Sequence, residues 1–148
     1  MRRPSVWFIL LIGLCVSIYF LTALPVFADA NTMRFFLWTG LPPIMADIID
    51  FIVRKLTHAT LFAGLAFIAF QALKPARWDY LLAWGFATLY GATDEWHQLY
   101  VMGRTGSSSD VLIDSAGAFL ILLLVYRQEI KRSRRNGSRS HRKLFFWS

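Results

Sequence analysis

The sequence predicts an all-α fold, a polytopic membrane bundle of about four transmembrane helices with both termini in the cytoplasm. Of its 148 residues, 56% are hydrophobic and only 17% are charged. The charges are clustered between long apolar runs, a pattern that a bilayer imposes because each spanning segment must satisfy its backbone hydrogen bonds internally. Lysine and arginine are also distributed unequally between the two sides of these runs, which predicts the orientation.

The predicted membrane domain covers residues 1–126. Its first span has roughly 20 apolar residues, which at about 1.5 Å per residue cross a hydrocarbon core of about 30 Å. The four apolar runs that predict spans are about 5–24, 56–73, 78–96 and 111–126.

The first apolar run has an alternative interpretation as a signal peptide. Arg2 and Arg3 precede it, and Ala28-Asp29-Ala30 follows it as a small-x-small cleavage pattern. We favour an uncleaved span because the run is longer than the usual apolar core of a signal peptide. Both interpretations place the N-terminus in the cytoplasm and the following segment outside.

With the N-terminus inside, twelve of the sixteen Lys and Arg residues fall on the cytoplasmic side, as the positive-inside rule requires. Eight of the twelve lie in residues 127–148, a basic cytoplasmic tail. We expect this tail to attract anionic lipid headgroups, at about 1 kcal/mol per basic residue, rather than nucleic acid. Its Arg-, Ser-, Asn- and Gly-rich composition after Ile130 predicts disorder.

The predicted outer loop, residues 25–55, contains two consecutive prolines that indicate a helix from residue 43. If this helix continues into the second span, it carries one polar stripe: Asp47, Asp50, Arg54 and His58. For Asp47 and Asp50 we favour a solvated helix face, with an Asp-Arg pair at i,i+4 spacing.

The candidate functional site begins at the outer end of the third span, in Asp94-Glu95-Trp96-His97-Gln98. Asp94 lies roughly 24 Å along the helix from Trp78, at about 1.5 Å per residue. Carboxylates at this depth are costly unless they pair or face a wet cavity, so they indicate a functional site. Ala87 and Gly91 share the face of Asp94, which predicts close contact with another helix there.

Two other segments are predicted to reach the same membrane level. His58 begins the second span three residues after Lys55, and Arg104 precedes the fourth span, which starts with Asp110 and Asp114. Helix capping explains Asp110 but not Asp114, which lies a full turn inside an apolar span. We expect Asp114 to pair with Arg104 or His58, and a small residue on the same helix, Gly117, to allow close packing.

The chemistry of these side chains predicts two sets of site residues. A carboxyl that stays protonated in the low dielectric would be a general acid beside a base, and Arg104 with the helix N-terminus would hold a phosphate. A metal such as zinc or manganese is an alternative, but the chain has no two-His helix motif, so we assign neither a metal nor a cofactor. The candidate catalytic residues are His58, Asp94, Glu95 and His97. The candidate ligand-binding residues are Lys55, Gln98, Arg104, Asp110 and Asp114.

The ordered motifs over about residues 50–126 resemble the VanZ-like family of bacterial membrane proteins. They are Lys55-x-x-His58, Asp94-Glu95-Trp96-His97-Gln98, Gly103-Arg104, and Asp110-Val111-Leu112-Ile113-Asp114-Ser115-Ala116-Gly117. Phe62 matches an aromatic position of the family, whereas Met102 stands where the family has proline. The resemblance implies a protein of the bacterial cytoplasmic (inner) membrane and cell envelope. It also implies a link to teicoplanin-type glycopeptide resistance, but no agreed reaction.

Four functions remain open on the sequence. The polar level, which the topology places toward the extracytoplasmic side, is expected to process an envelope lipid or lipid-linked precursor as an enzyme. Alternatively, it binds such a lipid or a glycopeptide without catalysis, as an accessory protein. Proton-coupled transport is a third possibility, disfavoured because the span pattern shows no repeat. The fourth is a scaffold in which the buried charges only hold the helices together.

Overall fold

The computed structural model describes residues 4–24, 29–74, 76–101 and 106–144, with side chains described up to residue 135. All the regular secondary structure in these ranges is helical, which confirms the all-α prediction. The helices are α1 (Pro4–Ala23), α2 (Asp29–Trp38), α3 (Pro43–Leu73), α4 (Asp79–Gln98) and α5 (Ser108–Leu144).

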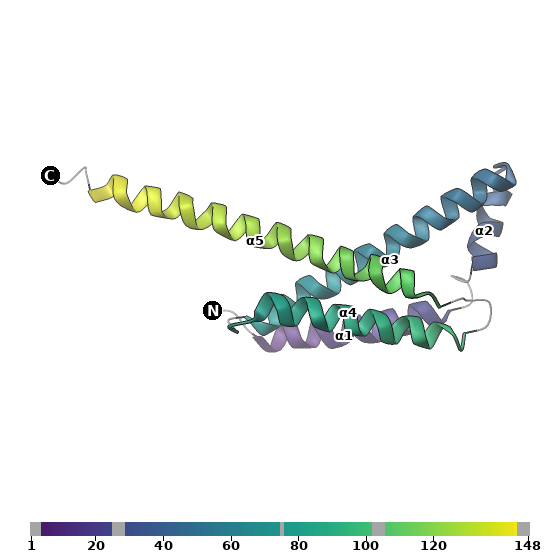
Figure 1. The fold of residues 1–148 in the computed structure, drawn as a ribbon, viewed down its shortest axis with the longest axis horizontal. Helices are drawn as coiled ribbons and strands as arrows, with labels where there is room; N and C mark the ends of the chain where they lie inside the picture. Colours follow the sequence, from purple (N-terminus) through teal and green to yellow (C-terminus); the bar gives the residue numbers. More distant parts are fainter. Residues whose placement is uncertain (1–3, 25–28, 75, 102–105, 145–148) are drawn as a thin grey trace.

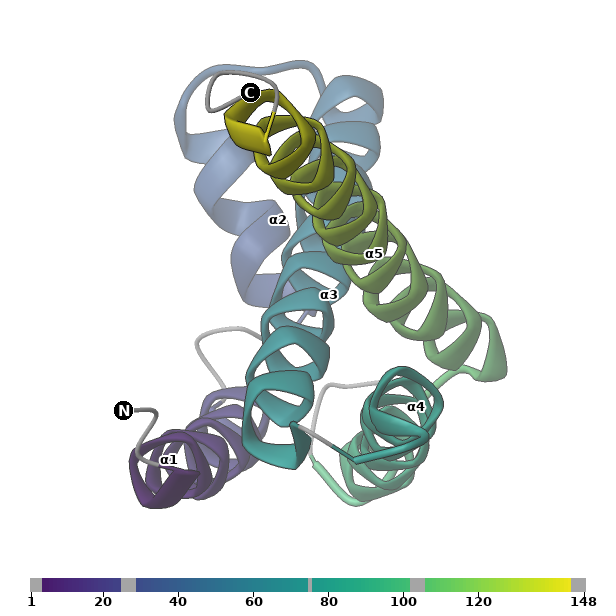
Figure 2. The ribbon, with the colours of Figure 1, turned by 90° about the vertical axis from the view of Figure 1, so that its left-hand side faces the viewer.

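Helix α3 is the centre of the arrangement, because it contacts α1, α2, α4 and α5. Viewed along the long axis, α1 and α4 lie on either side of α3, and α5 crosses above (Figure 2). Helix α3 has 31 residues, about 46 Å at 1.5 Å per residue, which exceeds a hydrocarbon core of about 30 Å. Its N-terminal half therefore extends away from α1 and α4, toward α2 (Figure 1).

The helix predicted from residue 43 is present, with a proline in its first turn, and it runs unbroken into the predicted second span. Asp50 and Arg54 form the expected i,i+4 pair, with 3.0 Å between Nε and Oδ2. The predicted solvated face is wrong for Asp50, however, which is only 2% exposed. Ala46, one turn earlier, is also buried, and α2 packs on this half of α3 (Figure 1).

Three helical segments are long and apolar enough to cross a membrane: Ser5–Ala23, Pro43–Leu73 and Ser108–Arg135. Helix α4 is not among them. Its exposed side carries Leu81, Leu82, Phe86 and Leu89, whereas its buried side includes Asp94, Glu95 and Gln98. An apolar exterior around a polar interior suits lipid better than water, which is consistent with a fourth span at α4. That span stays a prediction, and so does the cytoplasmic position of both termini.

The first residues of α1 and the last residues of α5 lie at the same end of the molecule (Figures 1 and 2). At this end Glu129 of α5 pairs with Lys74 and accepts a hydrogen bond of 2.8 Å from the Tyr80 hydroxyl. The prediction of disorder after Ile130 is wrong for α5, which continues to Leu144. An established helix extends readily through Arg and Lys, because propagation avoids the cost of nucleation.

Small residues allow α3 and α5 to approach closely, as predicted for Gly117. A Cβ atom added at Gly117 would lie 2.4 Å from the Ala59 carbonyl oxygen of α3. From this contact the apolar core continues toward the other end of the bundle. Its buried members include Phe62, Leu65, Phe70, Ala118 and Leu122.

We predict that Gly117→Ala destabilises the bundle. The added methyl group would collide with the Ala59 backbone, which cannot move aside by a side-chain rotation. A cost of about 1–3 kcal/mol is typical of overpacking. Gly64→Ala is the matched control, since an added Cβ there meets nothing within 4 Å. Thermal unfolding in detergent should give a lower midpoint for Gly117→Ala alone, and equal midpoints would contradict the close contact.

Candidate functional site

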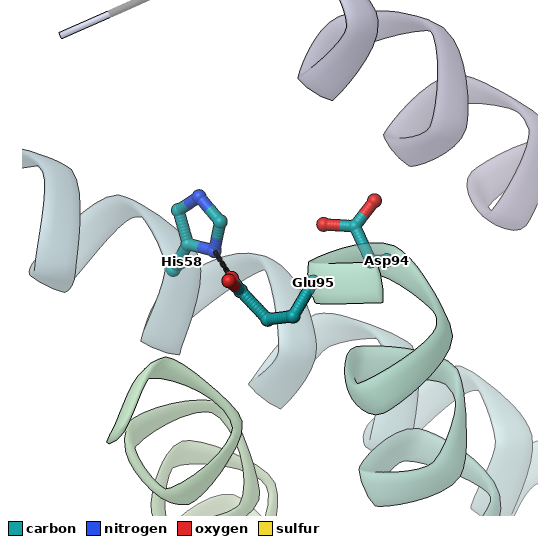
Figure 3. Close-up of side chains that lie close together, drawn as sticks. All are labelled: His58, Asp94 and Glu95. Carbon is teal, nitrogen blue, oxygen red and sulfur yellow. Dashed lines mark ion pairs between the residues drawn. The ribbon is translucent and has the colours of Figure 1, made fainter. Parts of the chain in front are cut away.

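Four ionisable side chains from three helices meet near the N-terminal end of α5. We call them the polar cluster: His58 of α3, Asp94 and Glu95 of α4, and Asp114 of α5. His58 Nδ1 lies 3.8 Å from Glu95 Oε1 and 3.7 Å from Asp114 Oδ2. Figure 3 shows the imidazole and the Glu95 carboxylate turned toward each other across the gap between α3 and α4. The structure thus joins Asp114 to His58, one of its two predicted partners.

Asp94 is held by hydrogen bonds on both carboxylate oxygens. The Thr22 hydroxyl of α1 donates to Oδ1 at 2.7 Å, and the Gln98 side-chain amide donates to Oδ2 at 2.7 Å. Asp94 is only 4% exposed, which confirms that its helix face points into the bundle. These two donors fix the orientation of the carboxylate within the polar cluster.

Glu95 is positioned by the segment that leads into α5. The Ser107 backbone N–H donates a hydrogen bond of 2.9 Å to Glu95 Oε2. Gly106 is needed for this contact, because an added Cβ would lie 2.4 Å from the Glu95 carbonyl oxygen. Gly91, one turn before Glu95, lies beside Asp114, and a Cβ added there would meet that side chain at 3.5 Å, which is ordinary van der Waals contact.

Several buried polar atoms of the cluster have no hydrogen-bond partner among the described residues. They are His58 Nδ1, Glu95 Oε1, and both carboxylate oxygens of Asp114. The Asp114 side chain is 0% exposed, and its contact with His58 is too long for a hydrogen bond. Buried polar groups are nearly always hydrogen-bonded, so these atoms are available to bind water, an ion or a ligand.

The other predicted site residues lie around the cluster or apart from it. Lys55 pairs with Asp110 at its edge, and these side chains are 20% and 17% exposed. His97 stacks on the Tyr19 ring of α1, with 4.2 Å between ring centroids, and no described contact joins it to the cluster. Arg104 lies outside the described residues.

Sequence reasoning missed Thr22, which reaches the cluster from the first helix. The same hydroxyl lies 2.9 Å from the Ile18 carbonyl oxygen of its own helix, a contact common for threonine in apolar helices, so its one hydrogen is shared between the two acceptors. The available signal was a single buried hydroxyl near the outer end of an apolar span, which alone does not reveal a partner on another helix.

The donor set is also compatible with a metal ion. His58, Asp94 and Glu95 each offer one ligand atom, and these three atoms lie within 4.8 Å of one another. Imidazole and carboxylate oxygens are ligands for zinc and manganese. No local sequence motif predicts this set, because His58 lies on α3 and the two carboxylates lie on α4.

Comparison with protein families matches residues 6–131 to VanZ/LLP1. The match extends from α1 into α5 and includes every residue of the polar cluster. No curated protein and no solved structure matches the chain.

We predict that Thr22→Val destabilises the protein, because it removes a buried donor and leaves Asp94 Oδ1 unpaired. An unsatisfied buried acceptor costs about 1–3 kcal/mol. Thr60→Val makes the same chemical change at an exposed hydroxyl that donates only to its own helix. The free energy of unfolding should fall for Thr22→Val and stay near wild type for Thr60→Val, and a similar fall in both would contradict a special role for the Thr22 bond.

Proposed function

Since the chain belongs to the VanZ/LLP1 family, we propose that it is a bacterial cell-envelope membrane protein that binds an envelope lipid. The proposed ligand is the head group of a lipid or lipid-linked cell-wall precursor, and the proposed site is the polar cluster. In the predicted topology the cluster lies near the outer leaflet of the cytoplasmic membrane, at the end of the bundle opposite to the basic tail.

The observation that carries this proposal is the set of unpaired buried atoms on His58, Glu95 and Asp114. Charges that serve only to hold helices together are expected to bond one another, because a partly satisfied network is less stable than an apolar core. Functional sites tolerate such local cost because a ligand completes the bonding. A ligand therefore accounts for the cluster better than scaffolding does.

A ligand would reach the cluster at its partly exposed edge. His58 is 17% exposed, and the Lys55–Asp110 pair beside it is also partly exposed. Apolar side chains around this level, including Leu56, Leu99 and Leu112, are exposed on the bundle surface. Partly exposed polar side chains next to apolar surface suit an amphiphilic ligand, whose head group would contact the cluster while its chains remain in the bilayer.

Catalysis at the lipid head group is the second candidate function. His58 lies between the carboxylates of Glu95 and Asp114, an arrangement in which an imidazole can accept or donate a proton while a carboxylate orients it. Binding and turnover would use the same residues, so only an experiment distinguishes these two functions.

The family resemblance extends the proposal to glycopeptide resistance of the teicoplanin type. A protein that binds a lipid-linked precursor at the outer leaflet would compete with a lipophilic glycopeptide for that target. The resistance phenotype would then depend on the same side chains as lipid binding.

We predict that His58→Ala and Asp114→Asn each reduce binding of envelope lipids at least about tenfold, the scale of one lost charge-assisted contact. The measurement is titration of purified protein in nanodiscs with labelled lipid-linked precursor. Asp47→Asn is the matched control, since Asp47 is exposed on α3 outside the cluster. Teicoplanin susceptibility of a host expressing each variant should follow the order of the affinities.

Three outcomes separate the functions. Saturable binding without product supports a binder, whereas turnover that is lost in Glu95→Gln selects the enzyme. Wild-type affinity in both cluster variants, with folding intact, would contradict a functional site at the cluster.

A further inference from the structure

We propose that the polar cluster binds a divalent transition-metal ion of the zinc or manganese class. The ligands are His58 Nδ1 and carboxylate oxygens of Asp94 and Glu95, with Asp114 beside them as a further carboxylate. The ion would hold the phosphate of the lipid head group, and this last step alone rests on the proposed function.

The geometry of the cluster is close to that of a metal site. In a tetrahedral zinc site with bonds of about 2.1 Å, neighbouring ligand atoms are about 3.4 Å apart. His58 Nδ1 lies 3.8 Å from Glu95 Oε1 and 3.7 Å from Asp114 Oδ2. These two separations exceed the ideal value by only a few tenths of an ångström. The ligand atoms of His58, Asp94 and Glu95 all lie within 4.8 Å of one another, so the three side chains would move closer together around an ion.

Three of the four side chains of the cluster have buried atoms that lack other partners, whereas both oxygens of Asp94 already accept hydrogen bonds. His58 Nδ1, Glu95 Oε1 and the Asp114 oxygens are buried without a hydrogen-bond partner in the described part of the chain. Asp114 is only 1% exposed. A cation would satisfy all three side chains at once, which no single hydrogen-bond donor can do.

The charge of the cluster also favours a bound cation. It combines three carboxylates with one imidazole, and burying uncompensated negative charge in a low-dielectric bundle is costly. Three ion pairs of lysine and arginine in the described part of the chain are with carboxylates outside the cluster: Arg54 with Asp50, Lys55 with Asp110 and Lys74 with Glu129. A divalent cation would supply the missing positive charge.

The surrounding hydrogen bonds resemble those that orient metal ligands. Thr22 and Gln98 each donate to one oxygen of Asp94 at 2.7 Å, and the Ser107 N–H donates to Glu95 Oε2. One lone pair on each Asp94 oxygen and both lone pairs on Glu95 Oε1 remain available to bind an ion. Carboxylates that ligate metals are commonly held in this way by a surrounding set of donors.

An ion also resolves a conflict in the proposed function. A phosphate group carries negative charge, and the cluster as it stands would repel it. A bound cation with an open coordination position reverses that field and gives the phosphate oxygen a direct ligand position. The acidic character of the cluster and a phosphate-bearing ligand are then compatible.

The first test is metal binding by the full-length protein in detergent, stripped with a chelator and titrated separately with Zn²⁺ and Mn²⁺ by calorimetry. We expect saturable binding of one ion per chain, weakened at least about tenfold in Glu95→Gln and in His58→Ala. Asp47→Asn removes a carboxylate from the same helix as His58 but outside the cluster, and should bind as wild type does. Absence of saturable binding, or equal affinity in all variants, would overturn the proposal.

A spectroscopic test identifies the ligand directly. In a Cys15→Ser background, His58→Cys loaded with Co²⁺ should show a near-ultraviolet thiolate-to-cobalt charge-transfer band, because thiolate is a strong ligand for such ions. The Cys15→Ser protein with His58 intact should lack the band. A Co²⁺-loaded His58→Cys protein without the band would show that position 58 does not touch the metal.

Lipid titration with and without the chelator separates this inference from the proposed function. Lipid binding that needs the metal supports both proposals. Lipid binding that persists in the chelator overturns the bridging role of the ion and leaves the proposed function standing. Metal binding without any lipid binding contradicts the proposed function and leaves the metal site standing.

Discussion

The close approach of α5 to α3, where Gly117 lies against the Ala59 backbone, sets the geometry of the half of the bundle that holds the polar cluster. Asp114 is one turn before Gly117 on α5, and His58 directly precedes Ala59 on α3. The same contact that joins the helices therefore also brings these two side chains to 3.7 Å. Any larger residue at position 117 would separate them.

Helix α4 completes the site because its small residues and its carboxylates share one face. Phe62 and Asp114 pack beside Gly91, and the next turn presents Asp94 and Glu95 to His58. The bundle gains stability from apolar and small-residue packing nearer its other end, where Phe70, Ala83 and Leu122 are buried. On the proposed function, the polar cluster adds little to that stability, because its unpaired buried atoms are a cost.

Much of this arrangement was predictable because helix periodicity is a local property. Spacings of three and four residues placed Asp94, Gln98 and Gly91 on one buried face, and the apolar runs identified the helical fold. The pairing of Asp114 with His58 followed from their common depth. Arg104, the other candidate, lies outside the described residues, so its part in the site stays a prediction.

The errors come from contacts between segments that are distant in sequence. Burial of Asp50 depends on α2, whose packing no pattern within α3 reveals. His97 is three residues after Asp94, but its ring stacks on Tyr19 of α1, a contact that depends on how α1 packs against α4. Thr22 and the Ser107 N–H entered the site from outside the recognised motifs, because a hydroxyl and a backbone amide carry no sequence signature of their partners.

The central claim is that the polar cluster is kept for a ligand at a cost in stability. Its most direct test is the unfolding midpoint of Asp114→Asn in chelator and without added lipid, compared with wild type under the same conditions. If the buried, unpaired carboxylate is a cost that only a ligand offsets, removing its charge should leave the midpoint equal or raise it. A midpoint lower by several degrees, with the ligand absent, would contradict the account and assign Asp114 to holding the helices together.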